Sequence, residues 1–324
     1  MSTWVKNTVQ YLLFLGIGLA LLYFSFQKVN TDDLWENISS VSISGLIGII
    51  AIGFLAMVFR GLRWVQMMKS MGYQVTGARA ISAVALSYLV NLVTPRVGEI
   101  IRCTALKRTN QVPIDKSLGT VVLERVVDLL MFLVVVISTL IISRDELSVF
   151  LSEKGPKLPE LTAISISLFV ITLFLFTLII IKTRKYWGQW KLILKLKDLT
   201  AGVVQGIKSL RTVDNKALFW LYSIGIWSCY VATIAVGFTL LSGLEIVGFE
   251  QAFFVSVAAG VGFMIPVPGA WGTYHTLVSS ALIILGVSGT DGMAFATLIH
   301  GSQSLMFVIT GALGFVFLYF AGRK

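Results

Sequence analysis

The sequence predicts an all-α polytopic membrane protein with about six full spans plus two re-entrant or broken helix hairpins, arranged as inverted repeats. Of the 324 residues, 56% are hydrophobic and only 13% are charged. The mean hydropathy of +0.86 excludes an ordinary soluble domain. Two further apolar stretches, one in each half, are interrupted by proline and glycine. Paired interruptions of this kind are typical of the binding site of a transporter.

The six predicted spans are residues 9–26, 43–59, 129–142, 161–181, 217–241 and 293–320. The first has no small-residue cleavage site, so we expect a retained span and not a signal peptide. Residues 117–122 extend the third span backwards. We expect one integral membrane domain over 1–324, with a first repeat over 43–142 and a second, inverted repeat over 217–320.

The two interrupted stretches are residues 80–106 and 249–286. Proline and glycine interrupt a helix, and irregular backbone at membrane depth is tolerated only inside protein or beside water. Each stretch is therefore predicted to be a re-entrant hairpin or two helices that meet at a kink, with two full spans as the alternative. The residues at the breaks are Pro95, Gly98, Pro266, Pro268, Gly269 and Gly272.

Lysines and arginines predict the orientation. They follow the second and fourth spans, precede the third and end the chain, which places the N- and C-termini in the cytoplasm. Residues 182–216 interleave tryptophan and leucine with lysine, as in an amphipathic helix on an anionic leaflet. We favour a helix that anchors the topology, with specific lipid recognition as the alternative. Under this orientation the two hairpins enter the membrane from opposite sides.

An alignment of the chain with itself supports the repeat. Residues 118–132 align with residues 294–308, so that Glu124 corresponds to His300 and Asp128 to Ser304. Residue identity is weak, and the order of features carries the prediction: span, broken hairpin, then a long helix with polar residues inside. Inverted repeats of this kind support alternating access.

Charged residues of the first half are the main candidates for substrate binding. The set is Asn91, Arg96, Glu99, Arg102, Glu124, Arg125 and Asp128. One interpretation is a neutralising network, with Arg96, Arg102 and Arg125 set against Glu99, Glu124 and Asp128, because buried ions need partners. The other is that one or two arginines stay partly free for an anionic group, since the planar guanidinium suits phosphate. Asn91 is expected to satisfy backbone at the break.

Arg60, Arg63 and Trp64 follow the second predicted span. We expect them to be anchors at the membrane interface, with their polar ends reaching head-group phosphate or water.

The second half contributes three candidates for substrate binding: His275, His300 and Gln303. The two histidines are the only ones in the chain. They are either hydrogen-bonded core residues or a proton-responsive pair. No carboxylate or cysteine lies near them in sequence, so we expect no metal site. The sequence has no hydrolase elbow and no phosphate-binding loop, so we expect neither an enzyme nor a cofactor.

In combination, four motifs resemble the lysylphosphatidylglycerol synthase/flippase transmembrane family, which includes the membrane half of the multiple peptide resistance factor. They are Arg60-x-x-Arg63-Trp64, Asn91-x-x-x-Pro95-Arg96-x-Gly98-Glu99-x-x-Arg102, Glu124-Arg125-x-x-Asp128 and Ile265-Pro266-x-Pro268-Gly269-x-x-Gly272. The resemblance covers nearly the whole chain. The sequence lacks the soluble transferase of full-length members. It also carries His275 where many relatives have glutamate and His300 where they often have arginine.

The resemblance implies a lipid flippase that moves a phospholipid, an aminoacylated phospholipid or a polyprenyl-phosphate-linked lipid across the bacterial inner membrane. The expected partners are membrane lipids, mainly anionic phospholipid or lipid phosphate, and no nucleic acid, with a homodimer left open. Two alternatives remain at this point. One is a secondary carrier of a small anionic solute, and the other is an accessory subunit of a lipid-modifying enzyme.

Overall fold

The computed structural model describes residues 30–142 and 213–322, together with scattered residues between 12 and 27. The predicted span 161–181 and nearly all of the connection 182–216 lie outside the described residues. The described part is built from helices: α2 (Thr31–Ser39), α3 (Ile43–Ser70), α4 (Gly77–Val93), α5 (Val97–Asn110), α6 (Ile114–Ile142), α10 (Lys216–Phe238), α11 (Phe249–Met264), η2 (Pro268–Ala270), α12 (Thr273–Ile284) and α13 (Gly289–Ala321).

Four of these helices are long and apolar enough to cross a membrane: α3, α6, α10 and α13. They contain most or all of four predicted spans. Side chains cap the first turns of three of them: Ser42 before α3, Asn215 before α10 and Ser288 before α13. Helix α3 continues to Ser70, well beyond the predicted end at residue 59. The extra turns remain helical and buried because Arg60 and Arg63 find carboxylate partners inside the protein.

Both interrupted stretches are pairs of helices, as predicted. In the first, α4 ends at Val93 and α5 begins at Val97, with Arg96 between them in a left-handed conformation at φ 67°. The Asn110 amide donates to the Gln74 carbonyl at 2.8 Å, so the outer ends of α4 and α5 are adjacent. The stretch is therefore a hairpin.

The second interrupted stretch consists of α11, the short turn η2 and α12. Gly269 and Gly272 have φ values of 56° and 83°, which glycine adopts without steric cost. A Cβ added to Gly286, after α12, would lie 3.5 Å from the Ile246 side chain before α11. This stretch is also a hairpin.

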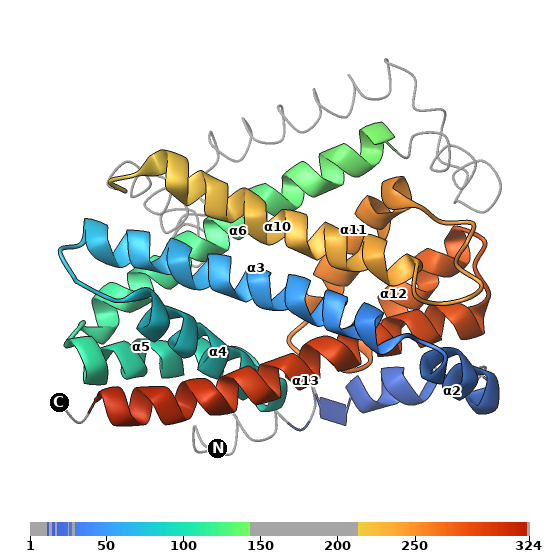
Figure 1. Cartoon of the computed structure of the whole chain (residues 1–324), viewed down its shortest axis with the longest axis horizontal. Helices are drawn as coiled ribbons and strands as arrows, with labels where there is room; N and C mark the ends of the chain where they lie inside the picture. The colour runs from blue at the N-terminus through green and yellow to red at the C-terminus, as the bar shows by residue number, and fades with distance from the viewer. Residues whose placement is uncertain are drawn as a thin grey trace, which may run out of the picture.

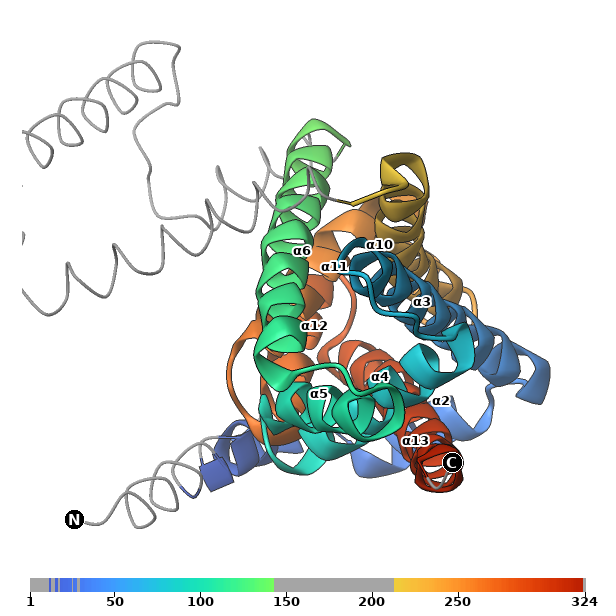
Figure 2. The same ribbon diagram turned by 90° about the vertical axis from the view of Figure 1, so that its left-hand side faces the viewer.

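The two hairpins open at opposite ends of the molecule. In Figure 1, α4 and α5 lie at the end that holds the C-terminus, whereas α11 and α12 lie at the other end with α2. Figure 2 looks along the molecule from the first of these ends and shows α13 beside α4, with α3 beside α10. The turn η2 packs against α4, and a Cβ on Gly269 would lie 3.1 Å from the Leu92 carbonyl. The tips of the two hairpins therefore meet.

Candidate functional site

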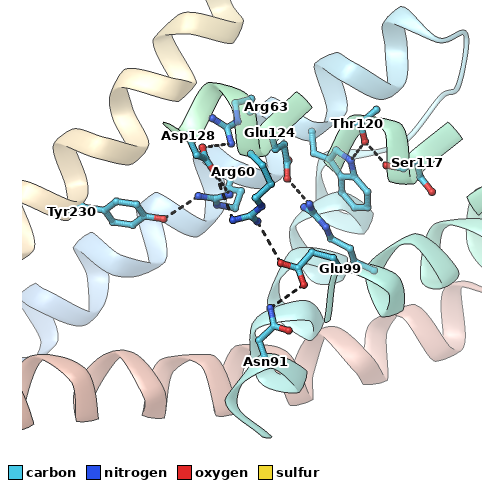
Figure 3. Close-up of polar contacts among 12 residues, drawn as sticks. Arg60, Arg63, Asn91, Glu99, Ser117, Thr120, Glu124, Asp128 and Tyr230 are labelled. Atoms are coloured by element: carbon cyan, nitrogen blue, oxygen red, sulfur yellow. Dashed lines mark hydrogen bonds and ion pairs between the residues drawn. The ribbon is translucent and has the colours of Figure 1, made fainter. Parts of the chain in front are cut away.

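Asp128 of α6 holds two arginines of α3. Its Oδ2 accepts from Nη1 of Arg60 and its Oδ1 from Nη2 of Arg63, both at 2.8 Å (Figure 3). Helix α10 supplies further acceptors. The Tyr230 hydroxyl accepts from Arg60 at 3.2 Å, and the Ser223 hydroxyl accepts from Arg63 at 3.3 Å. This cluster joins α3, α6 and α10.

A second ion pair joins Arg102 of α5 to Glu124 of α6, and both side chains are buried. The Arg102 guanidinium also lies over the Trp64 ring, 4.6 Å from its centroid. The indole Nε1 of Trp64 donates to the Thr120 hydroxyl at 2.8 Å. The pair thus packs against α3 as well.

The expectation that Arg60, Arg63 and Trp64 are membrane-interface anchors is wrong. Arg63 and Trp64 are 0% exposed, and Arg60 is 6% exposed. An interface anchor keeps its polar end in contact with water or head groups. These three side chains instead direct their polar atoms into the protein, because Asp128 and Thr120 of α6 lie opposite them.

Arg125 forms the loosest contacts of the group. Its Nη2 lies 3.5 Å from Oε1 of Glu99, and its Nη1 lies 4.0 Å from Oδ2 of Asp128. Its side chain is 54% exposed. Glu99 also accepts weakly from the Asn91 amide at 3.4 Å, and the other end of that amide accepts from the Gly98 N–H at 2.8 Å. Asn91 therefore satisfies backbone at the first break, as predicted.

The charges of this network do not cancel. Four guanidinium groups, those of Arg60, Arg63, Arg102 and Arg125, share three carboxylates, those of Glu99, Glu124 and Asp128. Three of the four guanidiniums are buried against a carboxylate at short range. The surplus positive charge lies with Arg60 and Arg63, which share Asp128, whereas Arg125 is the one guanidinium of the four that is exposed and loosely held.

Arg96 does not join the network. It precedes α5 at the first break, is exposed, and forms no ion pair with another of the described residues. The predicted opposition of Arg96, Arg102 and Arg125 to three carboxylates thus holds for two arginines, with Arg60 and Arg63 taking part instead of Arg96.

The two histidines of the second half lie where α13 meets the hairpin α11–α12. His275 and His300 are 1% and 2% exposed, and their ring centroids are 4.9 Å apart. Gln303 lies apart from them, donating to the Ile49 carbonyl of α3 at 3.3 Å. Among the described residues, no group of three His, Cys, Asp or Glu side chains is arranged to hold a metal ion.

Sequence reasoning missed the polar partners on α10 and the rings around the histidines. Tyr230 and Ser223 lie in an apolar helix, and nothing in the sequence marks their hydroxyls as hydrogen-bond acceptors for arginine. They accept from Arg60 and Arg63 only because α3 packs against α10. Trp271 and Tyr274 flank the second break directly, so their position beside His275 in the sequence could have suggested the ring contacts.

Comparison with known proteins gave one family match. The family model described as "Lysylphosphatidylglycerol synthase TM region" matches residues 11–311, which is most of the chain. Neither curated proteins nor solved structures gave a significant match.

Proposed function

Because this chain belongs to the lysylphosphatidylglycerol synthase transmembrane family, we propose that it moves a phosphate-bearing lipid across the membrane, with Arg125 as the phosphate contact. A membrane lipid-related function is common to the family. The lipid class extends to phospholipids, aminoacylated phospholipids and polyprenyl-phosphate carriers, which share a phosphate. The bacterial inner membrane, with both termini in the cytoplasm, is the proposed location.

The observation that carries the proposal is an exposed, loosely paired guanidinium on a membrane helix, that of Arg125 on α6. Arg125 lies about 16 Å along α6 from its start at Ile114, from a rise of 1.5 Å per residue. Helix α6 is longer than the ~30 Å hydrocarbon layer, and a layer centred on the helix would contain Arg125. An arginine at such a depth costs about 2.5–3.5 kcal/mol on insertion scales, so its presence there points to a function.

The surroundings of Arg125 favour a lipid over a small soluble anion. Its neighbours on the same face of α6, Val122 and Leu129, are each 48% exposed. Across the Glu99 contact, Ile100 of α5 is 52% exposed. These apolar surfaces suit acyl chains, while the guanidinium suits the phosphate to which the chains are attached. A site for a small anion would need no such apolar surroundings.

Movement of the lipid is proposed to use the two hairpins as inverted repeats. They open at opposite ends of the molecule and touch at their tips. Broken helices that meet at the middle of the membrane allow a central site to face either side in turn. In this scheme the Glu99 carboxylate contacts Arg125 while no lipid is bound, and the lipid phosphate takes its place when a lipid binds.

The experiment uses vesicles that contain the purified full chain and a fluorescent phosphatidylglycerol. A membrane-impermeant quencher reports the fraction of probe in the outer leaflet over time. Loss of one charge-assisted contact, worth about 1.5–3 kcal/mol, should slow movement about tenfold to a hundredfold in Arg125→Ala. Arg125→Lys should recover only part of the rate, because an ammonium lacks the planar fork.

Lys107→Ala provides the matched control. Lys107 is an exposed cation near the end of α5, far from the break, so its loss should leave the rate unchanged. The proposal fails if wild-type vesicles move the probe no faster than empty ones, or if Arg125→Ala equals wild type. Uptake of free inorganic phosphate that is lost in Arg125→Ala would favour the small-anion carrier instead.

A further inference from the structure

His275 of α12 and His300 of α13 form a buried pair enclosed by aromatic rings. The Trp271 ring stacks on His275 with centroids 5.6 Å apart, and the Tyr274 ring stacks on His300 at 5.0 Å. The ring centroids of Phe263, in α11, and His300 are 6.0 Å apart. The pair therefore lies in a largely apolar box.

The pair also holds the tip of the second hairpin. Nε2 of His300 lies 2.8 Å from the carbonyl oxygen of Gly269. A carbonyl can only accept, so Nε2 carries the proton, and Nδ1 of a neutral His300 has a free lone pair. In the described part of the chain, Nδ1 of neither His300 nor His275 has a hydrogen-bond partner. Both histidines can therefore take up a proton.

No negatively charged side chain among the described contacts of the two histidines compensates the charge of an added proton. Phe26 comes from the N-terminal helix, which is described in part between residues 12 and 27. Its ring centroid lies 6.5 Å from that of His275. Helix α11 contributes Phe263, and the start of α12 contributes Trp271 and Tyr274. Tyr274 is the only other titratable group in these ring contacts, and no hydrogen bond brings a carboxylate or a basic side chain to either imidazole among the described residues.

Hydroxyl groups line the same face of α13. Thr297 and Ser304 lie three residues before and four after His300, and helix periodicity places all three side chains together. The hydroxyl oxygens of both are buried without a hydrogen-bond partner in the described residues. Such oxygens can accept and donate in turn, which suits the passage of a proton along α13.

We propose that His275 and His300 form a proton-binding site whose occupancy separates the tips of the two hairpins. An isolated charge in apolar surroundings is costly, so a proton binds more strongly when the pair is hydrated. A ligand that binds one state better shifts the population toward that state. Protonation therefore favours an open arrangement in which His300 no longer holds Gly269 against Leu92 of α4.

The contacts at the tip explain how a local change would spread. Gly269 adjoins the Leu92 carbonyl, and a Cβ on Gly272 would lie 2.9 Å from the Leu22 backbone nitrogen of the N-terminal helix. The tip is thus held by His300 on one side and by close backbone packing on the other. Its release would free the junction between the hairpins. The link from this release to lipid movement rests on the proposed function.

The first measurement uses the fact that the chain has only two histidines. Histidine-selective ¹⁵N labelling, with an affinity tag that contains no histidine, gives one set of imidazole signals per site in vesicles. At neutral pH both rings should be neutral, with His300 protonated on Nε2 only. On acidification the pair should take up one proton first and a second only at lower pH, because two neighbouring cations repel each other. Rings that remain neutral throughout the pH range in which the protein stays folded would overturn the proposal.

The second measurement reports the opening itself. Val267→Cys places a thiol at the buried tip in a Cys103→Ala/Cys229→Ala background, and its labelling by a water-soluble thiosulfonate is followed against pH. Rates are divided by those of Ser242→Cys, an exposed loop position, to remove the pH dependence of the thiol chemistry. For one proton bound only by the open state, the ratio should rise about tenfold per pH unit of acidification.

The variant pair His275→Gln/His300→Gln should label at a rate that does not depend on pH after this correction. Tyr274→Phe keeps the stacked ring but removes its hydroxyl, and it should behave like wild type. An equal acid-induced rise in the double glutamine variant would refute the role of the histidines. If the tip opens with acid while the fluorescent lipid does not move, the proposed function fails and the proton site stands.

Discussion

The buried ion pair between Arg102 and Glu124 offers the sharpest test of how the first half is stabilised. We predict that Glu124→Gln and Arg102→Met each destabilise the protein strongly, whereas the double variant loses far less than the sum. In each single variant one charge stays buried without its main partner. In the double variant both charges are gone, and the methionine still fills space beside Trp64.

The magnitude follows from burial. Breaking a buried ion pair by removing one partner costs about 3–5 kcal/mol, while replacing both partners by well-packed apolar groups is often neutral. The double variant should therefore lose only the cost of the buried amide in Glu124→Gln, about 1–3 kcal/mol. The coupling energy of the cycle should therefore be about 3 kcal/mol or more. The pair Arg125–Glu99 is the internal control, since its guanidinium is 54% exposed and its closest contact is 3.5 Å. Its coupling should be about 0–1 kcal/mol.

The assay is reversible unfolding of the purified protein in mixed micelles, with the free energy of unfolding taken from helical signal against denaturant. The four proteins of each cycle are compared under one detergent composition. The reasoning is refuted if Glu124→Gln unfolds within about 1 kcal/mol of wild type, or if both cycles give the same coupling. Either result would mean that water reaches Glu124 freely despite its burial.

Two other substitutions test packing and hydrogen bonding. Gly98→Ala should destabilise the protein by about 1–3 kcal/mol in the same assay, because its Cβ would overlap the Ser87 carbonyl of α4. Gly119→Ala in α6 meets nothing within 4 Å and should stabilise by about 1 kcal/mol through helix propensity; equal effects at both sites would contradict the α4–α5 packing. Trp64→Phe removes the hydrogen bond to Thr120 and should cost about 1 kcal/mol, with Thr120→Val giving a similar loss and no additional loss when the two are combined.

The breaks were predictable from the sequence because their cause is local. Proline removes a backbone donor and clashes with the preceding turn, and glycine permits positive φ, whatever the tertiary contacts. The observed ends of α4 at Val93 and of α11 at Met264 follow directly. The spacing of Glu124 and Asp128, four residues apart, likewise placed both carboxylates on one face of α6.

The partners of the arginines were not predictable, because they depend on which helices pack together. Arg60 and Arg63 read as interface residues next to an apolar run, and Asp128 lies more than sixty positions away in sequence. The sequence also suggested that Arg96 belongs to the network. Arg96 instead lies at the break in a left-handed conformation, and the helix that follows it turns Glu99 and Arg102 toward α6. The sequence shows which residues are charged, but only the packing of α3 on α6 shows which of them form ion pairs.

The aligned positions Glu124 and His300 have corresponding surroundings but different chemistry. Each lies buried on a long helix and contacts the second helix of a hairpin, through Arg102 in one half and His275 in the other. Guanidinium does not lose its proton in proteins, so the arginines of the first half keep their charge across pH, whereas imidazole can change its charge. Any pH dependence of lipid movement should therefore persist in Arg125→Lys, although the rate is lower, and should vanish in His275→Gln/His300→Gln.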